Sequence, residues 1–391
     1  MSMRHRRVLM ATVNQWHSPF QVGSHHLARG FVQAGWEVGF VSEPISPWHL
    51  LGGNAEERRE RYRLYHSGGT RESSGRLWTY VPGALFTPHN KPVLNHPWIA
   101  EHWAQLTCPD LVGKLEREGF AEVDLLYCDS VVQQGWLGSI RAQKSVYRIA
   151  DALSGFKKTT AATLQLEQKV ARSVDLVVYA ARSLEGYVKN LRPKSMAYLP
   201  NAVNFGHFSA GSYECPQDYA AIPRPIAVYV GAMDVWFDYR LMNEVVVRLP
   251  HVSFVLIGPD ELARQRLRPR PNLHVLGRRP YEEVPAYLHH AHVGLIPFDA
   301  VNHAELVNSI HPLKLYEYAA CGLPIVATEW EELTYLKSPA HLCRGTEDFV
   351  RAIEQALSSR PERAPLQTYA AAHDWRARVS TLLDQLGVQA G

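Results

Sequence analysis

Several common signatures are missing from this sequence of 391 residues. Its five cysteines are scattered without Cys-x-x-Cys spacing, so we expect neither a zinc site nor a disulfide framework, and the compartment is expected to be reducing. No apolar run approaches the ~20 residues that span a membrane, and the stretch 8–13 is too short for a signal-peptide core. There is no Gly-x-Gly-x-x-Gly, no Gly-x-x-x-x-Gly-Lys-[Ser/Thr] and no Gly-x-Ser-x-Gly. These absences argue against a nicotinamide or flavin enzyme, a P-loop phosphotransferase and a serine hydrolase.

The charge balance gives no sign of a nucleic-acid partner. Apolar residues make up 46% and charged residues 20%, which is a globular composition, and the net charge of +3 does not demand a nucleic acid. Arginines at 58–63 alternate with glutamates, as on a solvated helix face. We therefore expect a cytoplasmic protein without a nucleic-acid partner. Peripheral contact at the inner face of the cell membrane, through basic N-terminal residues and the loops at 44–97, stays open.

Short apolar runs alternate with longer amphipathic ones along the whole chain, which is typical of parallel sheets covered by helices. A stretch rich in Gly, Ser, Pro and Asp interrupts this alternation and predicts a domain linker. A Pro-rich break precedes the last amphipathic run, and packing of that run against the first domain is one arrangement open to it. The fold class is therefore α/β, with a first Rossmann-like domain at 1–205, a linker at 206–225, a second such domain at 226–360 and a C-terminal helical segment at 361–391.

A short predicted helix at 312–321 carries the most informative pattern. Pro312 suits the first helical position and Gly322 the position after the last turn, so the helix offers N–H groups to an anion at its start. Lys314 and Glu317 are three residues apart and share a face. A cation near a helix N-terminus is unfavourable unless an anion binds there, so a phosphate would remove the conflict, and Glu317 could accept hydrogen bonds from a ribose diol. The alternative is an ordinary Lys–Glu pair on a solvated face.

The run Pro-x-Lys-x-Tyr-Glu-Tyr-x-Ala-x-Gly-x-Pro-Ile-Val at 312–326 resembles the nucleotide-sugar-binding helix of bacterial GT-B glycosyltransferases. These enzymes have two Rossmann-like domains with a cleft between them and build exopolysaccharides and teichuronic-acid-like polymers. Further likeness is found at 230–238, 256–259, 276–281 and 294–298, and more loosely at 147–151 and 199–204.

The resemblance implies a donor site in the C-terminal half. Glu317 would bind the donor ribose and Lys314 a diphosphate oxygen, and the turn at Gly231 would bring backbone N–H groups close to the phosphates. Arg278 follows a predicted strand and either flanks the nucleotide base or is a solvated loop arginine. No Asp-x-Asp is present, so neither a metal nor any other cofactor is expected.

Two departures from the retaining members of this group affect the expected mechanism. Ser309, taken with the donor-binding residues, stands where many retaining enzymes have a glutamate, and Met233 lies where an Arg–Lys pair is usual. The chain also resembles the xanthan-type glucuronosyltransferase group, in which an aspartate placed like Asp151 is the proposed base. A carboxylate can deprotonate an acceptor hydroxyl when burial raises its pKa. The alternative is that Asp151 caps a turn.

The loop after the first predicted strand is expected to bind the acceptor. Asn14 and His17 end this strand and His25 opens the following helix, and either histidine is a second candidate for the base. Packed or merely exposed histidines are the alternative.

Together these patterns predict a metal-independent glycosyltransferase of surface-polysaccharide synthesis. It would move a sugar from a nucleotide-diphosphate sugar to a glycan or lipid-linked acceptor with inversion, using Asp151 as the base. Two alternatives stay open: a retaining enzyme in which Asp151 is structural, and a catalytically silent GT-B-like binding protein.

Overall fold

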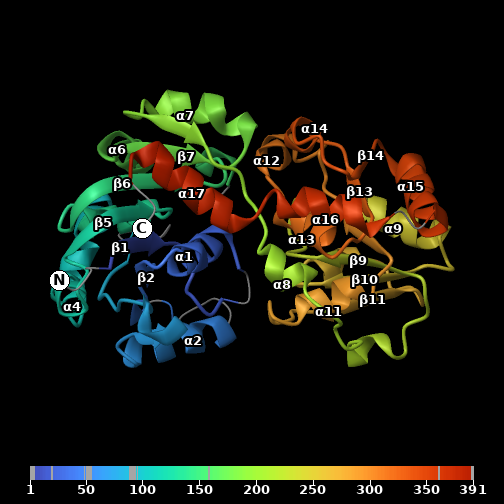
Figure 1. Cartoon of the computed structure of the whole chain (residues 1–391), viewed down its shortest axis with the longest axis horizontal. Coiled ribbons are helices and arrows are strands. Elements are labelled where there is room, and N and C mark those ends of the chain that lie inside the picture. The colour runs from blue at the N-terminus through green and yellow to red at the C-terminus, as the bar shows by residue number, and fades with distance from the viewer. Residues whose placement is uncertain are drawn as a thin grey trace. The chain divides into compact units, whose positions relative to one another are not determined.

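The computed structural model describes residues 5–18, 21–47, 49, 55–87, 94, 96–156, 159–359 and 362–388. The chain divides into two compact units (Figure 1). Unit 1 comprises Met1–Pro200 and Arg376–Gly391, and unit 2 comprises Asn201–Trp375. Each unit contains one mainly parallel sheet covered by helices, so the predicted α/β class with two Rossmann-like domains is confirmed.

The sheet of unit 1 has eight strands in the order β3-β4-β2-β1-β5-β6-β7-β8, and all neighbours are parallel except the β3–β4 pair. The central strands are apolar runs buried on both faces, as parallel sheets require. The strand order reverses between β1 and β5, and ligands of such sheets bind beyond the carboxyl ends of the strands at this point. The strands are β1 (Arg7–Thr12), β2 (Glu37–Ser42), β3 (Thr70–Glu72), β4 (Leu77–Tyr80), β5 (Glu122–Cys128), β6 (Arg141–Ile149), β7 (Leu176–Tyr179) and β8 (Met196–Tyr198).

Most helices of unit 1 follow the predicted amphipathic runs, with two exceptions. Helix α2 (Ala55–His66) lies within the stretch 44–97, where loops were expected. The sequence predicts one helix at 98–117, but the structure breaks it because Pro109 lacks the N–H that a continuing helix needs. The helices are α1 (Gly23–Gln33), α2 (Ala55–His66), α3 (Pro97–His102), α4 (Leu111–Arg117), α5 (Gln134–Leu137), α6 (Ala161–Ser173), α7 (Glu185–Leu191) and α17 (Trp375–Leu386), with 3-10 turns η2 (Ser73–Gly75), η3 (Trp103–Leu106), η4 (Val131–Gln133), η5 (Leu153–Gly155) and η6 (Arg182–Leu184).

The sheet of unit 2 is entirely parallel, with the order β11-β10-β9-β12-β13-β14. Counted along the chain this is 3-2-1-4-5-6, the order of dinucleotide-binding folds, and the order reverses between β9 and β12. The strands are β9 (Ile226–Val230), β10 (Ser253–Ile257), β11 (Leu273–Gly277), β12 (Val293–Ile296), β13 (Ile325–Thr328) and β14 (His341–Cys343).

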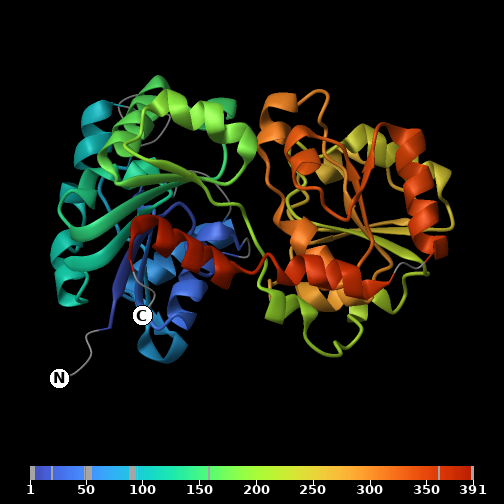
Figure 2. The same cartoon turned by 45° about the horizontal axis from the view of Figure 1, so that its top comes forward.

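Helices of unit 2 cover this sheet, as the second view shows (Figure 2). Residues 206–225, expected to be a linker, lie within this unit, where Phe208 and Tyr219 are buried in its core. The helices are α8 (Phe205–Ser209), α9 (Tyr239–Arg248), α10 (Ala263–Arg266), α11 (Val284–His289), α12 (Ala304–Ser309), α13 (Leu313–Ala320), α14 (Glu331–Tyr335), α15 (Thr346–Ser359) and α16 (Arg363–Ala371), with the 3-10 turn η7 (Gln217–Tyr219).

The last amphipathic run forms two helices that belong to different units. The main chain bends at Asp374, which forms a bridge with Val203, while its carboxylate accepts a hydrogen bond from the Phe205 N–H at 3.1 Å. Helix α16 packs on α13 in unit 2, and from Arg376 onward α17 belongs to unit 1 (Figure 1). In the part of the chain that the structure describes, no helix has the length and apolar character needed to cross a membrane.

Candidate functional site

Two glycine turns lie where strands β9 and β10 end. Gly231 and Gly258 both adopt a φ of +146°, which side chains rarely tolerate, and the Gly231 N–H donates to the Ile257 carbonyl at 2.9 Å. A Cβ on Gly258 would lie 1.9 Å from the Gly231 carbonyl oxygen, so the two turns are in direct main-chain contact. Glycine is therefore required here by close packing as well as by φ. The Gly231 turn is at the point where the sheet order reverses.

Helix α13 places Lys314 against this turn. Pro312 is its N-cap and supplies no side-chain hydrogen bond to the first turn. A Cβ on Gly231 would lie 3.0 Å from Lys314 Cε and 3.1 Å from Lys314 Nζ, so the ammonium lies beside the glycine backbone. The helix start, the glycine turn and a lysine thus meet at one place in unit 2, and such an arrangement suits a phosphate.

Lys314 and Glu317 are half-buried, and each has a perturbed pKa. Burial lowers the pKa of Lys314 to about 8, and the nearby Glu317 charge opposes this. Burial raises the pKa of Glu317 to about 7, opposed by Lys314. Within the described residues no ion pair shorter than 4.0 Å joins the two side chains. They influence each other electrostatically without neutralising each other by direct contact.

The other two expected donor residues have contacts of their own. Ser309 ends helix α12, is buried, and donates its hydroxyl hydrogen to the Leu306 carbonyl of its own helix at 2.7 Å. Arg278 follows β11, two strands from β9, and its Nη2 lies 3.6 Å from Glu261 Oε1. The structure therefore brings Gly231 and Lys314 together, with Glu317 on the same helix.

In unit 1 the expected acceptor residues surround the end of β1. Asn14 is half-buried in the loop after this strand, and its main-chain carbonyl accepts a hydrogen bond from Thr12 Oγ1 at 3.1 Å. His17 is further along the loop, with Nε2 3.5 Å from Glu72 Oε1. These two side chains lie at the carboxyl edge of the sheet, next to its reversal point.

His25 differs from the expectation that it contacts an acceptor or acts as a base. Its Nδ1 accepts the Val22 N–H at 3.2 Å, and its Nε2 lies 3.0 Å from the Gln15 carbonyl. The side chain is fully buried, and this burial lowers its pKa to about 4. Because both ring nitrogens already bind main-chain groups, His25 caps helix α1 and fixes the preceding loop.

Asp151 follows β6 and is half-buried at the same edge. Burial raises its pKa to about 6, and the neighbouring Arg148 partly opposes this. Asp129 follows the adjacent strand β5, and burial raises its pKa as well. The Asp129 carboxylate accepts the Val13 N–H at 3.0 Å and the Tyr127 hydroxyl at 3.4 Å, whereas no described residue donates a hydrogen bond to that of Asp151.

Comparisons with known proteins agree along both halves of the chain. Residues 10–180 match the family model described as the N-terminal domain of glucuronosyltransferase GumK, and residues 239–384 match a model described as glycosyl transferase-like. Both halves of this chain thus match glycosyltransferase families, and its fold is the GT-B fold. The resemblance that the sequence motifs indicated is thereby confirmed, and the protein is related to enzymes of polysaccharide biosynthesis.

One curated relative and two solved structures illustrate the kinship of this glycosyltransferase. TuaH of Bacillus subtilis, named as a candidate glycosyltransferase of teichuronic acid biosynthesis, is 24% identical over 172 residues, which are 41% of this chain and 43% of that protein. The match thus spans less than half of the relative. Anabaena HepE, solved with UDP and glucose, superposes with a TM-score of 0.63 at 16% identity, covering 98% of this chain and 100% of that one. Sucrose-phosphate synthase of Thermosynechococcus elongatus superposes with a TM-score of 0.62 at 16% identity, covering 98% of this chain and 96% of that one.

Sequence reasoning missed three polar residues of unit 1, which are two carboxylates and one arginine. Asp129 and Glu43 each follow a buried strand directly, as Asp151 nearly does, so the same rule applied to every strand would have found them. Burial raises the pKa of Glu43, whose carboxylate accepts the Ser130 hydroxyl at 2.6 Å. Arg148 is 4% exposed and lies against helix α1, since a Cβ on Gly23 would be 2.7 Å from its Nη2. Polar groups thus line the carboxyl edge of the unit 1 sheet.

A buried hydrogen-bonded chain, also missed, holds the loop before α13 in the glycosyltransferase. His311 Nδ1 lies 2.9 Å from Glu332 Oε1, and its Nε2 lies 2.8 Å from the Tyr316 hydroxyl. The His311 carbonyl accepts from Asn201 Nδ2 at 2.7 Å. Both side chains of the His311–Glu332 pair are fully buried, so this chain fixes the start of the helix that carries Lys314. Sequence position alone does not reveal it, because Glu332 is 21 residues away.

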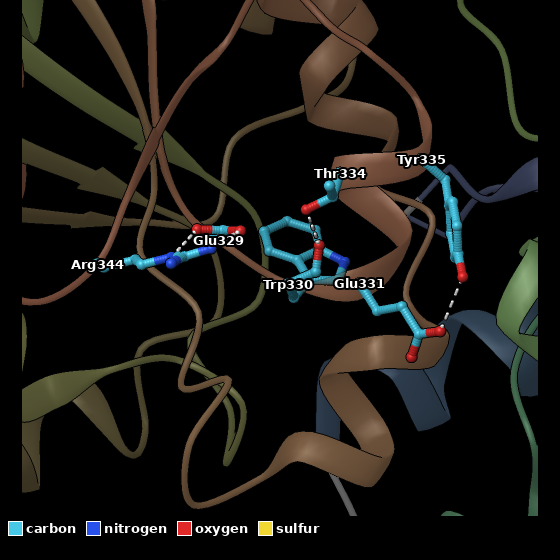
Figure 3. A pocket seen from close by; sticks show the side chains of 6 residues that line it. All are labelled: Glu329, Trp330, Glu331, Thr334, Tyr335 and Arg344. Atoms are coloured by element: carbon cyan, nitrogen blue, oxygen red, sulfur yellow. Dashed lines mark hydrogen bonds and ion pairs between the residues drawn. The ribbon is translucent and has the colours of Figure 1, made fainter.

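A recess of about 360 Å³ lies beyond the end of β13 (Figure 3). Its polar side chains are engaged with one another: Arg344 pairs with Glu329, and the Tyr335 hydroxyl donates to Glu331 at 3.2 Å. We therefore assign no ligand to this recess. Within the described residues, no group of three His, Cys, Asp or Glu side chains could hold a metal ion.

Proposed function

We propose that this glycosyltransferase binds a nucleoside-diphosphate sugar in unit 2 and transfers the sugar to a glycan or lipid-linked acceptor of a surface polysaccharide. The observation that carries the donor assignment is the meeting of Lys314, the start of helix α13 and the Gly231 turn at the reversal point of the sheet. Glu317, on the same helix, is placed to accept hydrogen bonds from the ribose. HepE, with the same fold, has been solved with UDP and with UDP-glucose, which supports uridine nucleotides as first probes.

The proposed chemistry is a single displacement with inversion. The Asp151 carboxylate takes the proton of the acceptor hydroxyl as its oxygen forms a bond to the anomeric carbon. The bond from that carbon to the diphosphate oxygen breaks, and the diphosphate leaves with the electron pair. Lys314 and the first-turn N–H groups of α13 would stabilise its charge. A base with a pKa near 6 is ionised at neutral pH and still accepts a proton, whereas Asp129 is already held by two hydrogen bonds.

The donor assignment is tested by calorimetric titration with UDP, GDP and ADP. We expect Lys314→Ala to weaken the best-bound nucleotide by about ten- to a hundredfold, because a hydrogen bond to a charged group is worth about 1.5–3 kcal/mol. Glu317→Ala should weaken the same nucleotide, while Lys189→Ala, an exposed lysine paired with Glu185, should not. Unchanged affinity in both α13 variants would remove the assignment.

The base assignment is tested by Asp151→Asn with any nucleotide sugar and acceptor that the parent enzyme uses. Donor affinity should be retained and transfer should fall by about a hundredfold or more, in keeping with the loss of general-base catalysis. The configuration of the product at the anomeric carbon, read by NMR, separates inversion from retention. Near-normal turnover of the variant, or a retained configuration, would leave Asp151 a structural role.

A further inference from the structure

We propose that Tyr229 and Phe298 are positioning residues for donor binding. Their ring faces hold the Lys314 ammonium beside the Gly231 turn and take the place of a carboxylate partner. The inference rests on the donor site proposed above. It concerns how that site keeps its cation available for a diphosphate.

The Lys314 ammonium lies close to two aromatic faces. Its Nζ is 4.7 Å from the centroid of the Phe298 ring and 5.2 Å from that of the Tyr229 ring. Both distances are within the ~6 Å over which a ring face attracts a cation. The two aromatic residues are 0–1% exposed, so little water weakens this attraction. We call Tyr229 and Phe298 the aromatic cradle.

The two rings are fixed from different strands at the reversal point of the sheet. The Tyr229 hydroxyl, on β9, donates to the Ala232 carbonyl at 2.7 Å. Phe298 follows β12, and its N–H and carbonyl both bind Thr328 Oγ1, at 2.9 and 2.8 Å. Strands β9 and β12 are neighbours, so the aromatic cradle forms where the strand order reverses. The ring positions are thus set by the sheet and its main-chain hydrogen bonds.

An aromatic partner and a carboxylate partner have different consequences for ligand binding. An ammonium group has three N–H donors, and a carboxylate paired with it would have to be displaced by an incoming phosphate. A ring face attracts the charge without taking a strong hydrogen bond from it. Glu317 acts on Lys314 electrostatically but does not pair with it within 4.0 Å in the described structure. The cradle therefore preorganises Lys314 and leaves its N–H donors for the ligand.

Protonation of Lys314 offers a direct readout of the cradle. Burial lowers the pKa of Lys314 to about 8, and the nearby Glu317 charge opposes this shift. Tyr229 faces the ammonium from β9, and burial raises the pKa of its hydroxyl far above neutrality, so it stays uncharged. A diphosphate binds the protonated lysine, so its affinity should fall as pH rises through about 8. Removing a ring face while keeping the surroundings apolar lowers the Lys314 pKa further and moves this fall to lower pH.

The decisive experiment measures the affinity for the best-bound nucleoside diphosphate between pH 6.5 and 9 by calorimetry. For Phe298→Leu we expect the fall in nucleotide affinity to begin about one pH unit lower, since a buried cation–π contact is worth about a factor of ten. The affinity should then be about tenfold below that of the parent at pH 8.5, and the difference should be much smaller at pH 6.5. Phe298→Tyr should restore the parent profile. Phe254→Leu, an equally buried ring on β10, controls for damage to the core and should keep the parent profile.

A second series keeps the fold even if Phe298→Leu does not. Fluorinated phenylalanines at position 298 retain the ring shape and weaken the negative ring face stepwise. We expect the midpoint of the pH profile to move down with each added fluorine. A profile that does not change along this series overturns the cradle, even if Lys314→Ala abolishes binding. If Lys314→Ala has no effect, the proposed donor site itself is wrong.

Discussion

Replacing Asp151 by Asn should stabilise the protein above pH 6, although it removes the proposed base. Burial raises the pKa of Asp151 from 3.8 to about 6. One pKa unit corresponds to about 1.36 kcal/mol, so holding this carboxylate ionised costs the folded state up to about 3 kcal/mol. Because the side chain is only half-buried, solvent screens its charge, and we expect Asp151→Asn to raise the free energy of unfolding by about 1–2 kcal/mol.

The sign of the pH dependence follows from the direction of the shift. The folded state favours the protonated Asp151, so its contribution to the free energy of unfolding is full below about pH 4 and is lost as pH rises through 6. Asparagine is neutral throughout. The difference in the free energy of unfolding between variant and parent should therefore be small near pH 4.5 and reach its full size above pH 6.5.

Urea denaturation followed by tryptophan fluorescence measures this difference at pH 4.5, 5.5, 6.5 and 7.5. Since the two units can unfold separately, the quantity compared is the shift in the transition of unit 1. Asp175→Asn is the matched control: its carboxylate accepts the Ser145 N–H and hydroxyl, both at 2.8 Å, so this variant should show no such gain. An Asp151→Asn protein that is less stable than the parent at pH 7.5 would refute the reasoning and favour a turn-capping aspartate.

Two further predictions concern the frame of the donor site. Gly258→Ala places a Cβ 1.9 Å from the Gly231 carbonyl oxygen, so both the nucleotide affinity measured by calorimetry and the melting temperature should fall strongly. The control is Gly186→Ala, in an open helical position, which should raise the free energy of unfolding by about 0.5–1 kcal/mol. Glu332→Ala leaves the buried His311 without its carboxylate partner and should lower the free energy of unfolding, measured in urea at pH 7.5, by about 3 kcal/mol. Glu332→Gln should lower this free energy by less. A cost below 1 kcal/mol for Glu332→Ala would show that the pair does not hold the loop before α13.

Most strands were predictable because the signal for a buried parallel strand is local. Strands such as β9 and β10 are short apolar runs, and their predicted and observed bounds agree. The edge strands β3 and β14 were missed because each has only three residues, which are too few to form such a run. The C-terminal helical segment expected at 361–391 contains two helices, because the main-chain bridge between Val203 and Asp374 interrupts it and no local pattern encodes a partner 171 positions away.

The sequence by itself determined that the chain forms two α/β units and that helix 312–321 carries Lys314 and Glu317 on one face, since periodicity and helix-end residues act over a few positions. Only the tertiary structure decided what surrounds those charges. The rings of Tyr229 and Phe298 are 69 residues apart in the chain and meet at Lys314 because β9 and β12 are neighbours in the sheet. Burial, which moves the pKa of Lys314 and Asp151 towards neutrality, is a property of packed neighbours from distant segments. Sequence spacing could propose these side chains, but only the packing around them determined their charge at neutral pH.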